Sequence, residues 1–240
     1  MTDQTSQPEA DALSLVEVQN AQSPLAKQAL AIYEASFPPE ERESQDSLLT
    51  LINLSAQGPL ADGTLFHFLA GVSGEAVQAM ALYTYHPQQR LGFLGYMAIT
   101  AVSRGQGLGG WMFQQTMARL AEEAGERPLG MCWEVQRPSD FNDLHERELA
   151  ERRIRFYQRH GSLIFPEVDL LTPSLGEGLP DVSYHLMYYP LDGATAVSPD
   201  RLRAMIDVIL GQNYGAAPDS IYYRRALQSI RNDMSASSTP

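Results

Sequence analysis

The sequence predicts an α/β fold of the α+β kind, in which helices flank a mixed and largely antiparallel central sheet. Three observations support this prediction. Apolar segments between residues 65 and 99 are separated by short turns, as in antiparallel hairpins. A glycine cluster then joins a strand-like segment to a helical one over residues 91–125. Finally, Leu129–Val135 is apolar almost throughout, which indicates a central strand.

The chain has 240 residues, which is enough for one large domain or for a domain with an appendage. We expect residues 11–195 to form the main domain and residues 196–231 to add two extra helices at the C-terminal end. Residues 1–10 and 232–240 are polar, so we expect them to be disordered.

The first elements follow from start and stop signals. Leu13–Val18 alternates between apolar and polar residues and therefore predicts a strand. Ser23-Pro24 provides a cap and a first helical residue, and the helix must end before Phe37–Pro39, since prolines cannot continue it. A second helix can begin at Ser44 or Asp46.

The later elements follow from the same kinds of signal. We expect further strands over Leu65–Val72, Ala76–Tyr85, Arg90–Ile99, Leu129–Val135, Leu163–Leu171 and Tyr184–Leu191. We expect further helices over Leu108–Ala124, Asp140–His160, Pro199–Leu210 and Pro218–Ile230, with Gly125, Gly161 and Gly211 as stop signals.

The charge balance narrows the classes of partner. A net charge of −12 argues against nucleic acid and against anionic membrane surfaces, both of which attract a basic face. The same charge is compatible with a cationic amine as substrate, although acidity also serves solubility. We therefore expect a small-molecule or peptide partner, and the sequence leaves open whether the chain forms a homodimer.

The single cysteine, Cys132, excludes an internal disulfide and favours a reducing, cytoplasmic setting. It lies in an apolar run, which favours an inert buried thiol over a nucleophile. The first eleven residues lack the apolar core of a signal peptide, and no apolar run approaches the roughly 20 residues that a membrane span needs. The five histidines show no metal-ligand spacing, so we expect no metal.

The glycine cluster predicts an anion site. An apolar segment ending at Ile99 precedes Arg104 and four glycines, and a helical segment follows them. Glycines let a ligand approach the backbone closely, and the first N–H groups of a helix have no partner within the helix. The helix dipole also favours negative charge there. The expected ligand is a phosphate or a pyrophosphate, although a glycine-rich turn that merely caps a helix would leave the same pattern.

Two kinds of phosphate site fit these glycines. Gly105, Gly107 and Gly110 match the G-x-G-x-x-G of dinucleotide-binding proteins, and Glu134 lies about where those proteins place their ribose-binding acid. However, five residues separate Ile99 from Gly105, whereas the fingerprint should follow its strand directly. The alternative is the R-G-Q-G-L-G of Arg104–Gly109.

A second motif supports the alternative. Phe156-Tyr157-x-x-x-Gly161 ends the helix expected after the fifth strand, about fifty residues beyond the glycine cluster. With both motifs and this element order, the chain resembles the GNAT superfamily of N-acyltransferases from about Leu13 to Leu191. It departs from the family at Ala150 and Arg153, where Asn and Ala are frequent, and the two C-terminal helices lie outside the resemblance.

The resemblance implies acetyl-CoA as cosubstrate. It implies that the strand residues Met97, Ala98 and Ile99 pair through their backbone with the pantetheine arm and that one of their N–H groups polarises the thioester carbonyl. The phosphate anchor is expected to comprise Arg104, Gly105, Gln106, Gly107, Leu108, Gly109 and Gly110.

The catalytic candidates are Tyr157 and Glu134. By the resemblance, Tyr157 would protonate the leaving thiolate. Glu134 lies where the family often has a carboxylate that acts as a base through water; a structural ion pair with Arg152 or Arg153 is the equal alternative. A base would need partial burial to raise its pKa.

An acidic segment precedes the second helix. Glu40 and Glu41 are either part of a solvated helix start or carboxylates that a substrate-facing loop offers to an amine. Together with His160, they are also weaker candidates for the base.

The leading hypothesis is an N-acetyltransferase that moves an acetyl group from acetyl-CoA to a primary amine by direct attack in a ternary complex. A CoA-binding module without catalysis and an NAD-dependent oxidoreductase are the alternatives.

Overall fold

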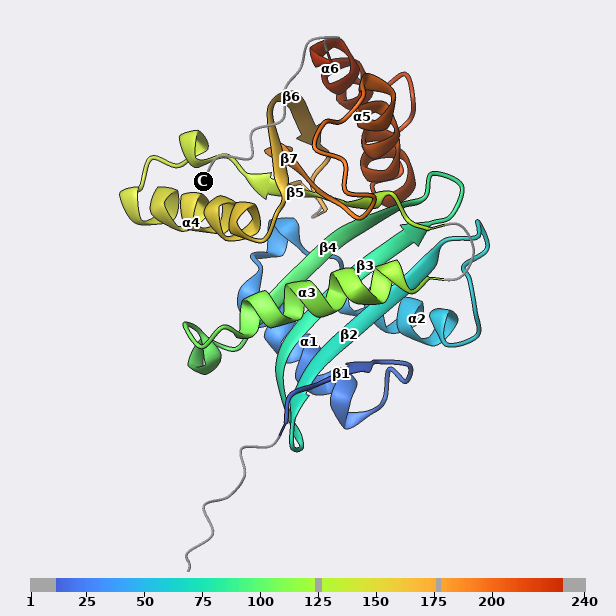
Figure 1. Cartoon of the computed structure of the whole chain (residues 1–240), viewed down its shortest axis with the longest axis vertical. Coiled ribbons are helices and arrows are strands. Elements are labelled where there is room, and N and C mark those ends of the chain that lie inside the picture. Colours follow the sequence, from blue (N-terminus) through green and yellow to red (C-terminus); the bar gives the residue numbers. More distant parts are fainter. Residues whose placement is uncertain (1–11, 124–126, 176–177, 231–240) are drawn as a thin grey trace, which may run out of the picture.

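The computed structural model describes residues 12–123, 127–175 and 178–230. They form a seven-stranded sheet in the order β1-β2-β3-β4-β5-β7-β6 (Figure 1). Only β4 and β5 pair in parallel; the other five pairs are antiparallel. The predicted mixed, largely antiparallel sheet with flanking helices is therefore confirmed. The sheet lacks the parallel order that the dinucleotide-binding alternative needs.

The bounds of the elements are close to those expected from the sequence. The strands are β1 (Ser14–Glu17), β2 (Leu65–Ser73), β3 (Ala76–His86), β4 (Leu91–Ile99), β5 (Gly130–Gln136), β6 (Leu163–Thr172) and β7 (Val182–Pro190). The α-helices are α1 (Pro24–Ser36), α2 (Gln45–Ser55), α3 (Leu108–Ala121), α4 (Leu144–Arg159), α5 (Pro199–Ile206) and α6 (Ile221–Ser229). Short 3-10 turns are η1 (Pro39–Glu41), η2 (Ala101–Ser103) and η3 (Pro138–Asp140), and a π-helical segment, η4 (Asp207–Asn213), continues α5.

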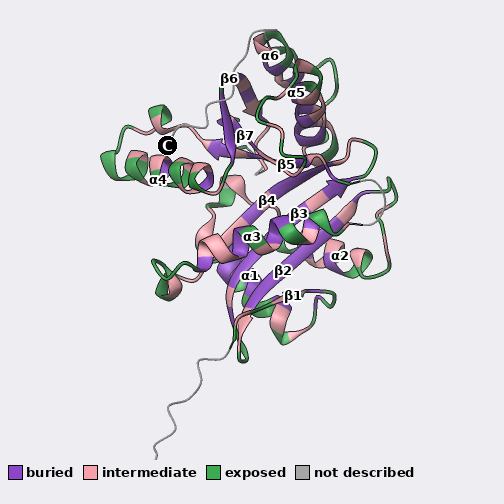
Figure 2. Ribbon diagram, viewed as in Figure 1, coloured by how far each residue is buried: buried purple, intermediate pink, exposed green. Residues whose placement is uncertain are grey.

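Helices cover both faces of the sheet. Neighbouring residues of a strand point to opposite faces, so Trp133 of β5 packs with α3 and α4 while Cys132 packs with α5, η4 and α6. Helices α1 and α2 cover the same face as α5 and α6, over the β1–β4 half of the sheet. The extra C-terminal helices thus pack on the sheet. Figure 2 shows the strands largely buried and α4 largely exposed.

The parallel pair β4–β5 is very short. It runs only over Leu91–Phe93 and Gly130–Cys132, and beyond these residues the two strands separate. The register of β4 against β3 also shifts between Leu82 and Tyr83, which leaves Gly95 as an extra residue. The sheet therefore opens between the C-terminal ends of β4 and β5.

Several helix ends differ from the prediction. Helix α3 ends at Ala121 rather than Ala124, and the expected stop at Gly125 lies outside the described residues, as do the expected disordered ends 1–10 and 232–240. Helix α4 begins at Leu144 rather than Asp140, because residues 138–140 form a separate turn and Asp143 provides the cap. Helix α6 begins at Ile221 because Ser220, not Pro218, provides its cap.

The stop predicted at Gly211 is wrong. The chain stays helical through this residue as the π-helix η4. A Cβ at position 211 would lie 2.3 Å from the hydroxyl of Tyr223, which donates a hydrogen bond to Asp207 at 2.8 Å. Gly211 therefore allows α6 to approach η4 closely instead of ending the helix.

The caps of the first two helices are as predicted: Ser23 accepts from the Ala26 N–H at 3.0 Å, and Ser44 accepts from the Ser47 N–H at 3.1 Å. No helix in residues 12–123, 127–175 and 178–230 combines the length and the apolar character that crossing a membrane requires.

A buried ionic cluster ties the edge strand β1 to α3. His67 of β2 lies between Glu17 of β1, at 2.6 Å, and Glu123 after α3, at 3.1 Å. Arg119 of α3 contacts both carboxylates, and the His67 ring stacks on Tyr83. Burial alone lowers the pKa of His67, but its bonds to Glu123 and Glu17 outweigh burial and raise the pKa overall. Burial raises the pKa of Glu17 and Glu123, but contacts with His67 and Arg119 outweigh burial and hold both pKa values below 4.5.

This cluster predicts a stability optimum in mild acid. The raised pKa of His67 stabilises the fold fully below 6.5, and this contribution is lost as the pH rises through the folded-state pKa. The lowered pKa values of Glu17 and Glu123 stabilise above 4.5, and that contribution is lost as the pH falls. We therefore expect the contribution of these three groups to the free energy of unfolding to be largest between pH 4.5 and 6.5, as measured by urea unfolding.

Replacing His67 by Gln should lower the free energy of unfolding by about 1–3 kcal/mol and flatten its decline above pH 6.5. The exposed His145→Gln is the matched control and should leave the profile as in the parent protein. An unchanged alkaline decline in His67→Gln would contradict the role given to this histidine.

Candidate active site

A cleft of about 1220 Å³ occupies the opening between β4 and β5. It is continuous from the glycine loop, across the separated ends of both strands, to the π-helical segment near the C-terminus. At the glycine-loop end it is lined by Arg104, Gly105, Gly107, Gly109, Gly110, Arg152, Phe156, Arg159 and His160. At the other end it is lined by residues that include Glu41, Glu43, Asp62, Thr84, His86, Glu134, Tyr184 and Tyr214.

Two glycines shape the loop at the start of α3. Gly105 has φ 79° and Gly107, the N-cap of α3, has φ 81°. No atom lies within 4 Å of a Cβ built at either position, so these glycines are required by conformation and not by lack of space. The loop thus leaves the first N–H groups of a helix open at the cleft, beside the guanidinium of Arg104, which suits a pyrophosphate.

The other two glycines of the cluster bring α3 against α4. A Cβ at Gly110 would lie 2.7 Å from Nε2 of His160, and one at Gly109 would lie 3.6 Å from Phe156. His160 also donates from Nδ1 to the Phe156 carbonyl at 2.8 Å. His160, a weaker candidate for the base, therefore joins α3 and α4 at the mouth of the cleft.

Gln106 and Leu108 contribute to the loop differently from the glycines. The Gln106 side chain donates to the Val102 carbonyl at 3.1 Å, and Leu108 is buried in the core under α3. Neither residue lines the cleft. Their backbone N–H groups are thus the parts that can serve the predicted anchor.

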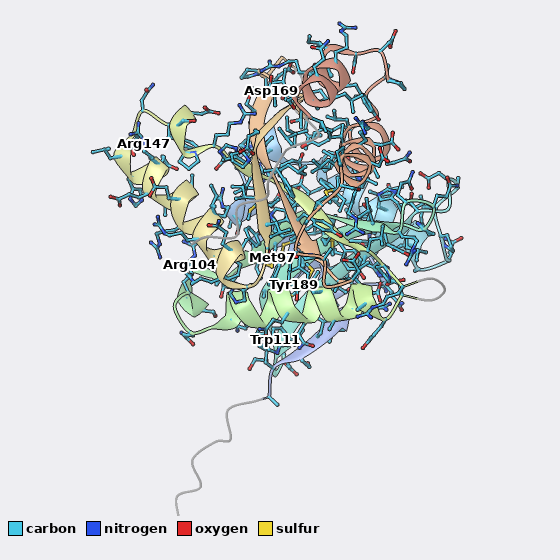
Figure 3. All side chains as sticks on the ribbon, turned by 45° about the horizontal axis from the view of Figure 1, so that its top comes forward. Met97, Arg104, Trp111, Arg147, Asp169 and Tyr189 are labelled. Carbon is cyan, nitrogen blue, oxygen red and sulfur yellow. The ribbon has the colours of Figure 1, made fainter. Side chains whose placement is uncertain are left out.

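The end of β4 has one free edge. Met97, Ala98 and Ile99 pair with β3 on one side, and no strand among the described residues pairs with their other side, which lines the cleft. In Figure 3, Arg104 lies near the start of α3 and the end of α4. An extended ligand can therefore add to this edge as a strand would.

Three arginines of α4, namely Arg152, Arg153 and Arg159, line the cleft, whereas Arg155 pairs with Glu151 at 3.0 Å on the exposed side of the helix. Arg153 reaches β5, where it donates to the Gln136 side chain that bonds to Glu41. Arg155 thus lies on a solvated face of the helix, where it pairs with a glutamate. The sequence could have indicated the orientation of Arg152, Arg153 and Arg159, because helical spacing places these three on the same side of the helix as Phe156.

Glu134 of β5 lines the cleft where the strands separate. Burial raises its pKa to about 7, a hydrogen bond from Tyr214 lowers it in part, and the nearby Glu41 raises it. Among the described residues, no partner contacts its Oε1 atom. The alternative of an ion pair with Arg152 or Arg153 is wrong: Arg153 instead donates to the Gln136 amide at 2.8 Å.

Tyr157 of α4 is 8% exposed and lines the same cleft. Its ring packs against Trp133, with centroids 4.8 Å apart, and against Phe113 at 5.5 Å. Burial raises the pKa of its hydroxyl to about 12, although Arg153 lowers it in part. The hydroxyl is therefore a proton donor at neutral pH.

The acidic turn η1 forms part of the cleft wall. Tyr96 of β4 donates to the Glu41 carbonyl at 2.9 Å and accepts from the Glu43 N–H at 3.1 Å, so the turn is fixed on the sheet. The Gln136 amide donates to the Glu41 carboxylate. The side chain of Glu40, the other substrate candidate, lies outside the part of the chain that the structure describes.

Three cleft residues come from a segment to which the sequence assigned no function. Gln212 and Asn213 end η4, Tyr214 follows it, and all three line the cleft. No motif marks them, because only the packing of α5 and α6 on the sheet brings them there. Within the described residues, no group of three histidine, cysteine, aspartate or glutamate side chains is arranged to hold a metal ion.

Compared as a sequence, the chain matches no protein-family model and no curated protein. Solved structures do match its fold. A protein of Bacteroides thetaiotaomicron assigned to the GNAT family of acetyltransferases superposes with a TM-score of 0.64 at 20% identity, over 85% of this chain and 99% of that one. A GNAT-family protein of Desulfovibrio desulfuricans gives a TM-score of 0.51 at 17% identity, over 75% and 99% of the two chains. An Acinetobacter baylyi protein assigned as an acetyltransferase gives 0.53 at 12% identity, over 78% and 96%.

The chain has the fold of the GNAT acetyltransferases.

Proposed function

We propose that this protein transfers an acetyl group from acetyl-CoA to a primary amine of a small molecule or peptide. The observation that carries the proposal is one continuous cleft with an anion cradle at one end and a carboxyl group of near-neutral pKa beyond it. Transfer by direct attack in a ternary complex requires both features within one space, because the amine must meet the acetyl group while the nucleotide portion stays anchored.

The glycine-loop end fits the phosphates of CoA. The N–H groups of residues 105–110 and the guanidinium of Arg104 would hold the pyrophosphate, with Arg152 and Arg159 as further cations along the mouth. The free edge of Met97–Ile99 would pair with the amides of the pantetheine arm, and one of its N–H groups would donate to the thioester carbonyl. Acetyl-CoA itself supplies the activated acetyl group.

Two side chains would move the protons. Glu134, with a pKa of about 7, would take the proton of the attacking amine at its unpartnered Oε1 atom, directly or through water. Tyr157 keeps its hydroxyl proton at neutral pH and would donate it to the departing sulfur. Because β4 and β5 are separated, residues from both faces of the sheet reach the same space.

The far end of the cleft favours a cationic amine. Its lining includes Glu41, Glu43 and Asp62, and among the described residues these carboxylates outnumber the one arginine, Arg153, that reaches this end through Gln136. Hydrogen bonds of Asp62, chiefly with the Thr64 backbone, keep its pKa low, so its carboxylate is charged at neutral pH. The buried Cys132 fits the reducing cytoplasmic setting in which we place this reaction.

Changing Gly107 to Ala should weaken binding of CoA about tenfold. Alanine at φ 81° costs about 1–2 kcal/mol, which shifts the loop away from its anion-binding form. Gly193→Ala, at φ 74° with nothing within 4 Å and outside the cleft, has the same backbone strain and should bind CoA normally. Calorimetric titration decides; equal weakening in both variants would contradict the cradle.

Changing Glu134 to Gln should lower kcat/KM for acetyl transfer about 10²- to 10⁴-fold without weakening binding of acetyl-CoA. In the parent protein, activity should rise through about pH 7 as Glu134 loses its proton, and this limb should be absent from the residual activity of the variant. Release of CoA thiol in the presence of spermidine, putrescine or alanine amide measures the rate; the sole cysteine is buried and adds little background. The exposed Glu148→Gln is the control.

Changing Tyr157 to Phe should lower kcat by about 10²-fold and leave the affinity for acetyl-CoA unchanged, because the ring still packs on Trp133 and Phe113. Tyr189→Phe, a tyrosine on the far side of Phe113 and outside the cleft, should keep full activity. Binding of acetyl-CoA with no turnover of any amine in the parent protein would instead support the non-catalytic CoA-binding alternative.

A further inference from the structure

The C-terminal extension reaches the cleft through an unusual helical turn. Helix α5 continues as the π-helix η4, and the turn closes with Tyr214 N–H donating to the Ile209 carbonyl at 3.1 Å and Ala216 N–H donating to Leu210 at 2.8 Å. Such wide turns are rare and occur frequently at functional sites. Here the turn brings Gln212, Asn213 and Tyr214 to the cleft wall. We refer to these three residues as the π-turn.

The π-turn is fixed to the sheet at the floor of the cleft. Asn213 accepts from the Thr84 hydroxyl at 3.0 Å, and its amide nitrogen lies 3.2 Å from Nε2 of His86 and donates to the Val208 carbonyl at 2.7 Å. Burial lowers the pKa of His86 to about 4, so this histidine stays neutral and requires no counter-charge. The position of Tyr214, the next residue, is thereby set by β3.

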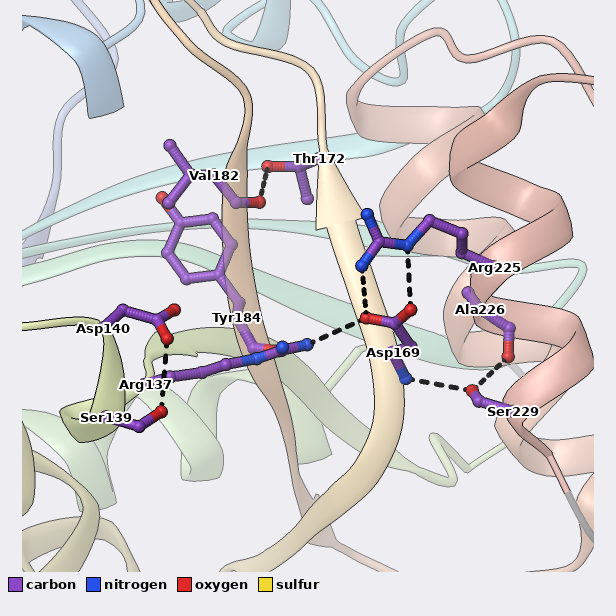
Figure 4. A network of polar contacts seen from close by, with 10 residues as sticks. All are labelled: Arg137, Ser139, Asp140, Asp169, Thr172, Val182, Tyr184, Arg225, Ala226 and Ser229. Carbon is purple, nitrogen blue, oxygen red and sulfur yellow. Dashed lines mark hydrogen bonds and ion pairs between the residues drawn. The ribbon is translucent and has the colours of Figure 1, made fainter.

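The rest of the extension is anchored on β6, which is the edge strand of the sheet. Figure 4 shows Arg225 of α6 in a two-point contact with Asp169 of β6, at 2.8 and 2.9 Å. Ser229 accepts from the Asp169 N–H at 2.9 Å, and Arg137, next to β5, reaches the same carboxylate at 3.4 Å. The extension is therefore held at both ends, by α6 on β6 and by the π-turn on β3.

Glu134 is a cleft carboxyl on which the π-turn acts. Tyr214 and Glu134 line the same cleft, and the Tyr214 hydroxyl acts on the carboxyl as a hydrogen-bonding neighbour that lowers the pKa of Glu134 against the effect of burial. Among the described residues, the other ionisable groups that act on the Glu134 site are Glu41 from η1, Tyr184 from β7 and Cys132 from its own strand, and none of these is a cation. Tyr214 is thus the neighbour that favours the charged form of this carboxyl.

We infer that the C-terminal extension is a working part of the acceptor end of the cleft, in which Tyr214 is a positioning residue that holds one oxygen of Glu134 and leaves Oε1 facing the amine. The inference rests on the proposed role of Glu134 as base. It assigns the extension, which the resemblance does not cover, a part in the reaction: without Tyr214 the carboxyl would keep its proton to higher pH and would be free to rotate.

The test measures the ionisation of Glu134 directly, so it does not depend on an identified acceptor. Glutamate labelled with ¹³C at the carboxyl carbon is titrated by NMR, and the Glu134 signal is identified by its loss in Glu134→Gln. In Tyr214→Phe the midpoint should rise by about one pH unit above the value near 7. Tyr223→Phe, which removes a hydroxyl from α6 that bonds to Asp207, should leave the midpoint unchanged. An unchanged midpoint in Tyr214→Phe would overturn the inference.

A second variant and a kinetic readout complete the test. Asn213→Ala leaves the tyrosine in place but removes the bonds that fix the π-turn on Thr84 and on the Val208 carbonyl, and it should shift the midpoint upward by less; no shift there would overturn the inference if Tyr214→Phe did not fold. With spermidine as acceptor, the rise of kcat/KM with pH should move by the same amount as the NMR midpoint. Failure of the parent protein to turn over acetyl-CoA would contradict the proposed function, whereas the NMR titration alone decides the contact of Tyr214 with Glu134.

Discussion

The short parallel pairing of β4 and β5 is the constraint on which the rest of the site depends. Only three residues of each strand pair, and the strands then separate. Separation leaves the edge of Met97–Ile99 without a strand partner and opens a passage between the two faces of the sheet. The glycine loop and α4 border this passage on one side, and η1 and the π-turn border it on the other. Had the strands stayed paired, Tyr157 and Glu134 would lie on opposite sides of a closed sheet.

The electrostatics of the cleft differ between its two ends. Arginines from α4 and the glycine loop give positive charge where phosphates would bind, although the whole chain carries a net charge of −12. The other end holds carboxylates, and there burial rather than an ion pair sets the pKa of Glu134. This division suits an anionic cosubstrate and a cationic acceptor that enter from opposite ends.

The sequence predicted the local features and missed those that depend on distant packing. Start and stop signals gave the caps at Ser23 and Ser44, and the glycine spacing located the loop, because these features involve residues that are neighbours in the chain. Gly211 looks like a stop for the same local reason, yet the close approach of Tyr223 decides its conformation. Tyr214 and Asn213 could not be identified, since they reach the cleft only after α5 and α6 pack on the sheet.

The central claim is that the glycine loop and the free edge of β4 hold acetyl-CoA, and hydrogen–deuterium exchange of the full chain with and without acetyl-CoA tests it most directly. The account predicts that exchange slows at the backbone N–H groups of residues 97–99 and 105–110 when acetyl-CoA binds. Saturating acetyl-CoA that leaves these amides unprotected, or that protects a different surface, would contradict it.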